Sequence, residues 1–259
     1  MIRERLVERE VGARSSFRWR SHEISRIEGL SDAVFAFAVT LLVVSLEVPK
    51  TFTELSETMR GFGAFAISFC LLFLVWFNQY KFFRRYGLQD GTTVVLNAAL
   101  LFVVLFYVYP LKFLFTFLVD KLMGGHGEVR LANGNVAPML ESESQMATLM
   151  LIFGAGYLAV FLVFVALYLH AYRKRGSLEL NEIELFDTRH SIQEMVLNCL
   201  IAVFSMSLIL IGGVRFGGLS GVAYMLTGVV MAINGTVMGR RRKKLEQQQH
   251  IPTLEAEQV

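Results

Sequence analysis

Residues 26–44 read Arg-Ile-Glu-Gly-Leu-Ser-Asp-Ala-Val-Phe-Ala-Phe-Ala-Val-Thr-Leu-Leu-Val-Val, a polar head followed by an apolar body. The apolar run continues to residue 49, so residues 27–49 are long enough to cross ~30 Å of hydrocarbon at a rise of ~1.5 Å per residue. No small-x-small cleavage pattern follows, which argues against a cleaved signal peptide. We therefore predict a retained transmembrane helix.

Five more stretches of similar length and character follow this one along the chain. They are residues 61–83, 93–119, 146–170, 191–212 and 219–238. Hydrophobic residues make up 54% of the 259 residues, and the mean hydropathy is +0.50, which is too apolar for an ordinary soluble domain. Every backbone polar group must be satisfied inside the bilayer, so we predict an all-α integral membrane protein with six transmembrane helices.

Basic residues alternate between the connections of these six spans. The arm before the first span, the second and fourth connections and the tail carry most of the lysines and arginines, including Arg3, Arg5, Arg9, Arg14, Arg18, Arg20, Lys81, Arg84, Arg85, Arg173, Lys174, Arg175, Arg189, Arg240, Arg241, Arg242, Lys243 and Lys244. The positive-inside rule then places both termini in the cytoplasm. We divide the chain into a cytoplasmic N-terminal arm (1–25), a transmembrane domain (26–239) and a basic cytoplasmic tail (240–259).

Two segments outside the spans are predicted to have little regular structure. Residues 120–145 are rich in glycine and lack periodicity, which indicates an exposed loop of low order. The tail after Lys244 is predicted to extend the last helix briefly and then fray into disorder.

The first helix has one apolar stripe and one buried acid. At ~100° per residue Phe37, Leu41 and Val44 share a stripe that Leu30 extends inward, and Asp32 lies nearly opposite. Such a stripe can face a central axis, or it can face lipid or pack in the bundle, which is the default for a membrane helix. An unpaired carboxylate at this depth is costly, so Asp32 is expected to have a partner on a neighbouring helix.

Several motifs in the first half of the chain resemble those of the prokaryotic transmembrane protein 175 family of potassium channels. The head of the first helix resembles the family's Arg-x-x-x-Phe-Ser-Asp signature, with Arg26, Leu30, Ser31 and Asp32. The second span ends in a similar way, and the third carries a similar Leu-Asn pair and proline, at Trp76, Asn78, Gln79, Leu96, Asn97 and Pro110. The last three spans match only in number.

The resemblance implies a homotetramer, embedded in a bacterial inner membrane, whose first helices line a central pore permeable to potassium ions. The pore constriction it implies is formed by Phe37, Leu41 and Val44, with Thr40 adjacent. It also implies a polar network that holds the first helix on the second and third, formed by Arg26, Ser31, Asp32, Trp76 and Asn97. The permeating potassium ion is the only ligand expected, and no cofactor, metal site, nucleic acid or enzymatic activity is expected.

The sequence departs from the family pattern at three places. The signature phenylalanine is Leu30, the innermost constriction residue is the aromatic Phe37, and a histidine near Trp76 is absent, so that Asn78 or Gln79 is expected to supply part of the network. No Thr-Val-Gly-Tyr-Gly filter sequence occurs, so selection is expected to depend on the cost of partial dehydration in an apolar constriction and to be modest.

Two other functions fit the pattern. A proton-coupled secondary transporter could use Asp32 together with Glu194, which has His190 and Asn198 at helical spacing, although a polar cluster at the membrane interface explains these three residues as well. A membrane scaffold without a conducting pathway is the third possibility. Lys112 is predicted to snorkel to the outer interface.

Overall fold

The computed structural model describes residues 17–21, 23–44, 51–130 and 135–256. Six helices of 19 residues or more dominate it: α2 (Arg26–Val44), α4 (Phe62–Tyr86), α5 (Gly91–Leu122), α6 (Glu143–Arg173), α7 (Glu182–Gly212) and α9 (Leu226–Ala256). The predicted all-α architecture with six long helices is confirmed. Five segments meet a length and hydropathy criterion for crossing a membrane, namely α4 to α7 and the segment from Val214 to Gln248.

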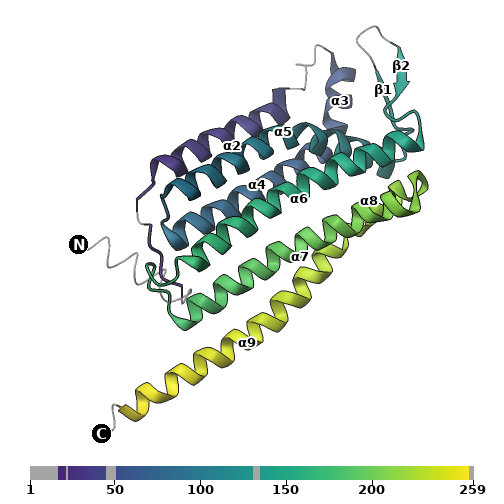
Figure 1. Cartoon of the computed structure of the whole chain (residues 1–259). Helices are drawn as coiled ribbons and strands as arrows, with labels where there is room; N and C mark the ends of the chain where they lie inside the picture. Colours follow the sequence, from purple (N-terminus) through teal and green to yellow (C-terminus); the bar gives the residue numbers. More distant parts are fainter. Residues whose placement is uncertain (1–16, 22, 45–50, 131–134, 257–259) are drawn as a thin grey trace.

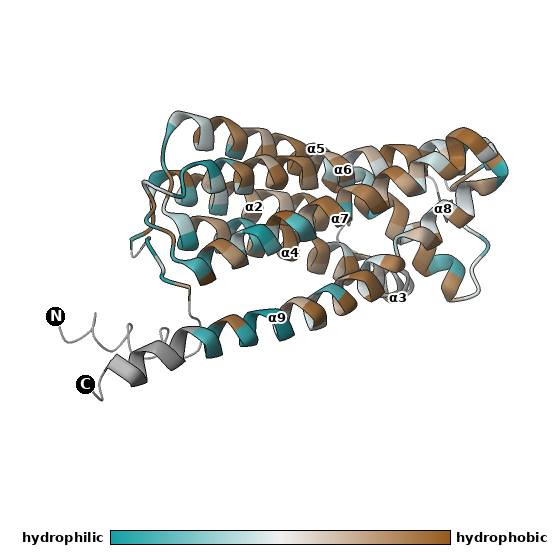
Figure 2. Cartoon of the chain, turned by 60° about the horizontal axis from the view of Figure 1, so that its bottom comes forward, coloured by the Kyte–Doolittle hydropathy of each residue, from teal (hydrophilic) through white to brown (hydrophobic). Residues whose placement is uncertain are grey.

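The long helices pack in a series from α2 to α9 (Figure 1). Helix α2 lies against α4 and α5, α5 lies against α6, α6 against α7, and α7 against α9. Helices α2 and α9 lie on opposite sides of the bundle and share no contact among the described residues. Most helical surface is hydrophobic, and polar residues are most numerous at the end of the bundle where α2 begins and along the middle of α9 (Figure 2).

Local sequence signals set several helix ends. Asn181 caps α7, because its side chain accepts from the N–H of Glu184 while Glu184 accepts from the N–H of Asn181, a capping box. Helix α4 ends at Tyr86 and is capped by Gly87, whose φ of 59° suits glycine and whose N–H donates to the carbonyl of Phe83. These caps fix where α4 ends before the turn to α5 and where α7 begins after the turn from α6.

The structure differs in four places from the segments outlined from the sequence, and one of the four, α3 (Phe52–Arg60), lies where no structure was predicted. Helix α7 begins at Glu182 rather than at residue 191, because its first turns are polar and capped and therefore escape a hydropathy criterion. Helix α3 is short and lies in the first connection. Residues 120–145 are not wholly irregular, since β1 (Glu128–Arg130) pairs antiparallel with β2 (Val136–Pro138).

The fourth difference concerns the last span, which is not one continuous helix. A 3₁₀ turn η1 (Val214–Phe216) and the short α8 (Gly217–Ala223) come first, and α9 follows after a turn. Helix α9 then continues past Lys244 to Ala256, further than the brief extension predicted.

The segment before α2 is bound to the polar end of the bundle. Arg20 forms an ion pair with Glu184 of α7 at 2.6 Å, and its backbone N–H donates to the carbonyl of Arg84 at 3.1 Å. Phe17 is buried edge-to-face against Tyr86 in the main core. This segment (residues 17–21), which we call the N-terminal strap, therefore fixes the point at which α2 begins.

Candidate functional site

Helix α2 begins with a capping box that was not predicted from the sequence. The backbone N–H of Ser25 donates to the carboxylate of Glu28 at 2.8 Å, and the N–H of Glu28 donates to the hydroxyl of Ser25 at 3.2 Å. The Ser-x-x-Glu spacing of Ser25 and Glu28 is the sequence signature of this motif, so the capping box could have been predicted. Glu28 is buried, so this acid serves the helix end.

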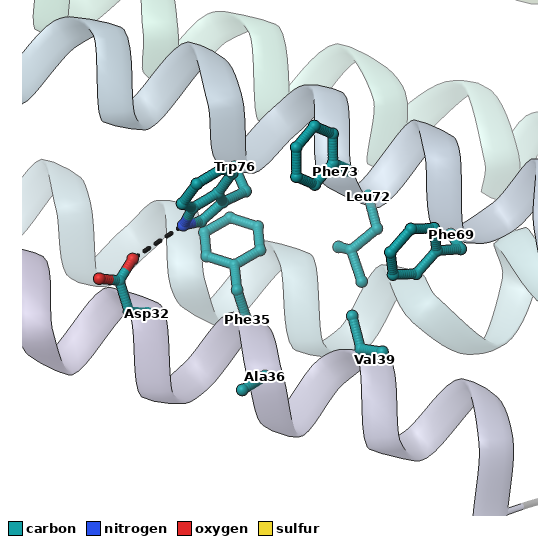
Figure 3. Close-up of a pocket in the computed structure, with 8 residues that line it drawn as sticks. All are labelled: Asp32, Phe35, Ala36, Val39, Phe69, Leu72, Phe73 and Trp76. Carbon is teal, nitrogen blue, oxygen red and sulfur yellow. Dashed lines mark hydrogen bonds between the residues drawn. The ribbon is translucent and has the colours of Figure 1, made fainter.

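Asp32 is joined to α4 through Trp76, as Figure 3 shows. The indole Nε1 of Trp76 donates to Oδ1 of Asp32 at 2.8 Å. The carboxylate remains exposed in the single chain. Because an indole N–H can only donate and a carboxylate can only accept, the pair is chemically matched. Asp32 thus has the helix partner that its depth in the apolar run led us to expect.

A second polar chain joins α2 to α5 and α4 through Asn97. Its side-chain amide donates to the hydroxyl of Ser31 at 2.9 Å, and its carbonyl oxygen accepts from Nε2 of Gln79 at 2.8 Å. The hydroxyl of Ser31 donates in turn to the carbonyl of Ile27 at 2.8 Å. Ser31, Gln79 and Asn97 are all buried, so each bond lies in a site of low dielectric.

The structure decides which amide takes part in this network. Gln79 bonds to Asn97, whereas Asn78 donates to the carbonyl of Leu74 within its own helix at 2.9 Å. Arg26 stands apart, because its side chain is exposed and makes no hydrogen bond or ion pair to another described residue. Its assigned role in the network stays a prediction.

The face of α2 turned away from α4 and α5 carries two of the predicted pore residues, Phe37 and Thr40. Phe37 is 56% exposed, and Thr40 is exposed with its hydroxyl bonded to the carbonyl of Ala36 at 2.9 Å. Leu41 is half-buried and packs partly against the main core, so it lies at the edge of the exposed face rather than at its centre. The side chain of Val44 lies outside the described residues. The pore-lining roles of these four residues remain predictions.

The outer part of α2 is bound by a contact that the sequence did not indicate. Nζ of Lys112 on α5 donates to the backbone carbonyl of Leu42 at 2.7 Å. The prediction that Lys112 snorkels to the outer interface misses this link. Leu42 itself is fully buried, so α2 is packed at this level as well as bonded.

A shallow apolar groove lies beside Asp32 between α2 and α4. It has a volume of about 250 Å³, and Asp32 and Trp76 stand at one end of it (Figure 3). The rest of the lining is apolar: Phe35, Ala36, Val39, Phe69, Leu72 and Phe73. Ala36 in this lining is next to Phe37 on α2, and both residues are exposed, so the groove adjoins the exposed face of that helix.

The other candidate residues form separate clusters. His190 lies 3.4 Å from Glu194, and the amide oxygen of Asn198 accepts from the hydroxyl of Tyr157. His190, Glu194 and Asn198 are on α7, which does not contact α2 among the described residues, so the structure does not bring Asp32 and Glu194 together. No group of three His, Cys, Asp or Glu side chains in the described ranges has the arrangement of a metal site.

One ion cluster joins the start of α5 to the end of α6. Asp90 accepts from His170 at 2.8 Å and from Thr93 at 2.6 Å, and Lys174 lies 3.3 Å away. Burial raises the pKa of Asp90, but the hydrogen bonds from Thr93, Lys174 and His170 outweigh it and lower the pKa to about 2. Asp90 is therefore ionised at neutral pH, and the cluster is a structural tie.

Comparison with known proteins identifies relatives over nearly the whole chain. Residues 26–107 match the family model described as "Endosomal/lysosomal potassium channel TMEM175". A potassium channel of Marivirga tractuosa is 39% identical over 246 residues, which cover 94% of this chain and 99% of the relative. A potassium channel of Streptomyces collinus is 30% identical over 38% of this chain and 50% of its own length.

Solved structures give the same result. The crystal structure of a variant of the potassium channel MtTMEM175, in complex with a nanobody–MBP fusion, superposes with a TM-score of 0.74 at 41% identity, over 86% of this chain and 97% of that one. The TMEM175 homologue of Chamaesiphon minutus shares the fold, with a TM-score of 0.54 at 22% identity over 83% of this chain and 99% of that one. Its full-length relatives and its helix arrangement place this chain in the TMEM175 family of potassium channels.

Proposed function

We propose that four copies of this chain form a potassium-permeable channel, with the four α2 helices around a common axis and the exposed face of α2 lining the pore. One observation carries this arrangement. The inner face of α2 is fixed to α4 and α5 by Trp76, Asn97 and packing, while the opposite face presents Phe37 and Thr40 with no covering residue in the described chain. A helix held in this way offers a rigid, unpartnered surface for symmetric assembly.

The chemistry of such a pore is that of an apolar constriction. Rings of Phe37, Leu41 and Val44 would force a permeating ion to lose part of its hydration shell, which costs less for potassium than for the smaller sodium ion. The hydroxyl of Thr40 donates to Ala36, so its oxygen keeps lone pairs that can accept from water or approach a cation. The ring of Phe37 adds a π face of the kind that attracts cations. Selectivity for potassium is therefore expected to be modest.

The membrane placement completes the proposal. The alternation of basic residues supports the placement of both termini in the cytoplasm, and the similarity to potassium channels of bacteria supports the bacterial inner membrane. In this orientation the N-terminal strap and the charged half of α9 lie on the cytoplasmic side. No cofactor enters the mechanism, and the function requires no catalysis.

Flux through the purified protein in liposomes tests the proposal. Vesicles loaded with potassium should lose their gradient passively, with no imposed pH gradient, because a constriction that only dehydrates the ion needs no second driving force. A potassium-sensitive dye or ⁸⁶Rb⁺ uptake measures the flux. A flux that requires a pH gradient would indicate a coupled transporter, and the absence of flux from folded, oligomeric protein would contradict the channel.

Truncation of Leu41 tests its place at the edge of the pore face. Leu41→Ala should change potassium conductance or the potassium-to-sodium ratio by a few-fold, because it widens an apolar constriction. Leu41 also packs partly against the core, so a loss of stability of about 1–2 kcal/mol is expected as well. Single-channel recording measures the first effect and thermal unfolding the second. Unchanged conductance and selectivity would remove Leu41 from the pore.

A further inference from the structure

A second groove lies on the other side of the subunit, between α7 and α9. It has a volume of about 340 Å³ and is lined at three positions by polar side chains, those of Gln193, Asn234 and Arg241. The rest of its lining is aliphatic or methionine, and Ile233 at 60% exposed and Val237 at 43% exposed stand at its open side. The groove is thus apolar along its length and polar at defined points.

Asn234 presents an unpaired donor in this groove. The residue is 8% exposed, and its Oδ1 accepts from Nε2 of Gln193 at 3.1 Å. Its Nδ2 is buried and has no hydrogen-bond partner among the described residues. Buried amide donors in native proteins are nearly always paired, because an unpaired one loses its bond to water without replacement. We therefore expect a hydrogen-bond acceptor from outside the chain to bind Nδ2 of Asn234.

Arg241 supplies a positive charge at the end of the same groove. It lies seven residues, or two helical turns, beyond Asn234, so both side chains are on one face of α9 at an axial separation of about 10 Å. Its guanidinium has no hydrogen bond or ion pair to any residue in the described ranges, and the side chain is exposed. The adjacent Arg242 is engaged with Asp187 at 2.9 Å and Glu246 at 2.8 Å. Arg242 therefore fastens α9 to α7, and Arg241 is available to a ligand.

The charge around Arg241 selects for an anion. Arg240, Lys243 and Lys244 are exposed on the same two turns of α9. They follow the last apolar turn of the helix, which places them at the depth of lipid headgroups. A cluster of basic residues at this position attracts the anionic lipids of the inner leaflet.

We propose that the α7–α9 groove binds an anionic phospholipid. The lipid phosphate accepts from the guanidinium of Arg241, an ester carbonyl accepts from Nδ2 of Asn234, and one acyl chain lies along the apolar wall past Val230. The order of these groups along a phospholipid, with phosphate, ester and chain at increasing depth, matches the order of Arg241, Asn234 and Val230 along α9. A ligand of this class satisfies both the unpaired donor and the free cation.

The position of the groove in the subunit also favours lipid over a second copy of the chain. Helix α9 lies on the side of the bundle opposite α2 (Figure 1). With α2 at the channel axis, as proposed above, α9 is at the periphery, where the bilayer is the neighbour. The binding itself does not depend on ion conduction, so it can be measured whether or not the channel proposal holds.

Native mass spectrometry of the full-length protein in detergent, with phosphatidylglycerol or phosphatidylcholine added, tests the proposal. The protein should bind phosphatidylglycerol more tightly than phosphatidylcholine. Arg241→Gln should weaken phosphatidylglycerol binding about fiftyfold, of which about fivefold is the general effect of one basic residue near anionic lipid and about tenfold is the lost charged hydrogen bond. Arg240→Gln is the matched control, with the same change of charge one residue away, and should weaken binding only about fivefold.

Asn234→Leu separates the ester contact from the phosphate contact. Both lipids carry the ester carbonyl, so this variant should weaken the binding of each by the same factor, about fivefold. Equal effects of Arg240→Gln and Arg241→Gln would overturn the groove site in favour of diffuse attraction to a basic surface. Equal affinity for the two lipids would also overturn it. So would an absence of bound lipid together with an altered subunit number in Arg241→Gln, which would make the groove a contact between subunits.

Discussion

Asn97→Leu should destabilise the protein by about 2–4 kcal/mol and abolish potassium flux. The substitution keeps the side-chain volume but removes both hydrogen bonds of the buried amide, those to Ser31 and Gln79. The buried amide of Gln79 loses its acceptor, which costs about 1–3 kcal/mol, whereas Ser31 keeps its bond to the Ile27 carbonyl and loses one hydrogen bond worth about 1 kcal/mol. The same change releases the inner face of α2, so the arrangement of the predicted pore helix should fail together with the stability.

Asn78→Leu provides the control for this experiment. It makes the same chemical change on α4, but the Asn78 amide donates only to the carbonyl of Leu74 in its own helix. Its effect on stability should be within about 0.5 kcal/mol. Thermal unfolding in detergent, followed by tryptophan fluorescence, and liposome flux measure both variants. Equal melting temperatures for the two would show that the Ser31–Asn97–Gln79 chain does not hold α2 in place.

Phe37→Ala should raise potassium conductance by about tenfold and lower the preference for potassium over sodium. Phe37 is 56% exposed on the predicted pore face, so four copies of the ring would meet near the axis. Replacing each ring with a methyl group widens the constriction enough for an ion to keep more of its water, which removes the dehydration cost that selects between the two cations. Because the Phe37 ring is exposed, Phe37→Ala removes few packing contacts within the subunit and should leave its stability nearly unchanged.

Phe102→Ala is the matched control, since it truncates an aromatic residue that is 73% exposed on α5. Bilayer recordings with potassium on one side and sodium on the other give conductance and reversal potential for both variants. Phe102→Ala should leave both quantities unchanged. A reversal potential for Phe37→Ala that matches the unmodified channel would place the ring outside the ion pathway.

The sequence predicted the helices and the partners of Asp32 better than it predicted the ends of the elements. Runs of 20 or more apolar residues are read reliably because the bilayer imposes their length. The start of α7 was missed because its first turns are polar and capped by Asn181, and helix α3 was missed because a nine-residue helix leaves no signal of that length.

In the candidate site, the sequence motif indicated which residues take part, but it did not indicate the contacts that depend on how the helices pack. The resemblance to a family motif implied that Asp32, Trp76, Ser31 and Asn97 belong together, and the structure places them in pairs at hydrogen-bond distance. Gln79 could not be separated from Asn78 by sequence, because the choice depends on which side of α4 faces α5. The bond from Lys112 to the carbonyl of Leu42 could not be predicted either. Every residue has a backbone carbonyl, so the sequence does not indicate which one accepts the bond.

The polar bonds that hold α2 are unevenly distributed along its length. Its first two turns carry the capping box, Ser31 and Asp32, and they follow directly on the N-terminal strap, whereas nearer its C-terminal end Lys112 donates to the carbonyl of Leu42. Among the described residues, the N-terminal end of α2 is therefore held by more polar contacts than the rest of the helix. In the proposed channel a change in pore width is therefore expected to involve the C-terminal half of α2, and loss of the Lys112 bond to Leu42 in each subunit should make that half easier to move.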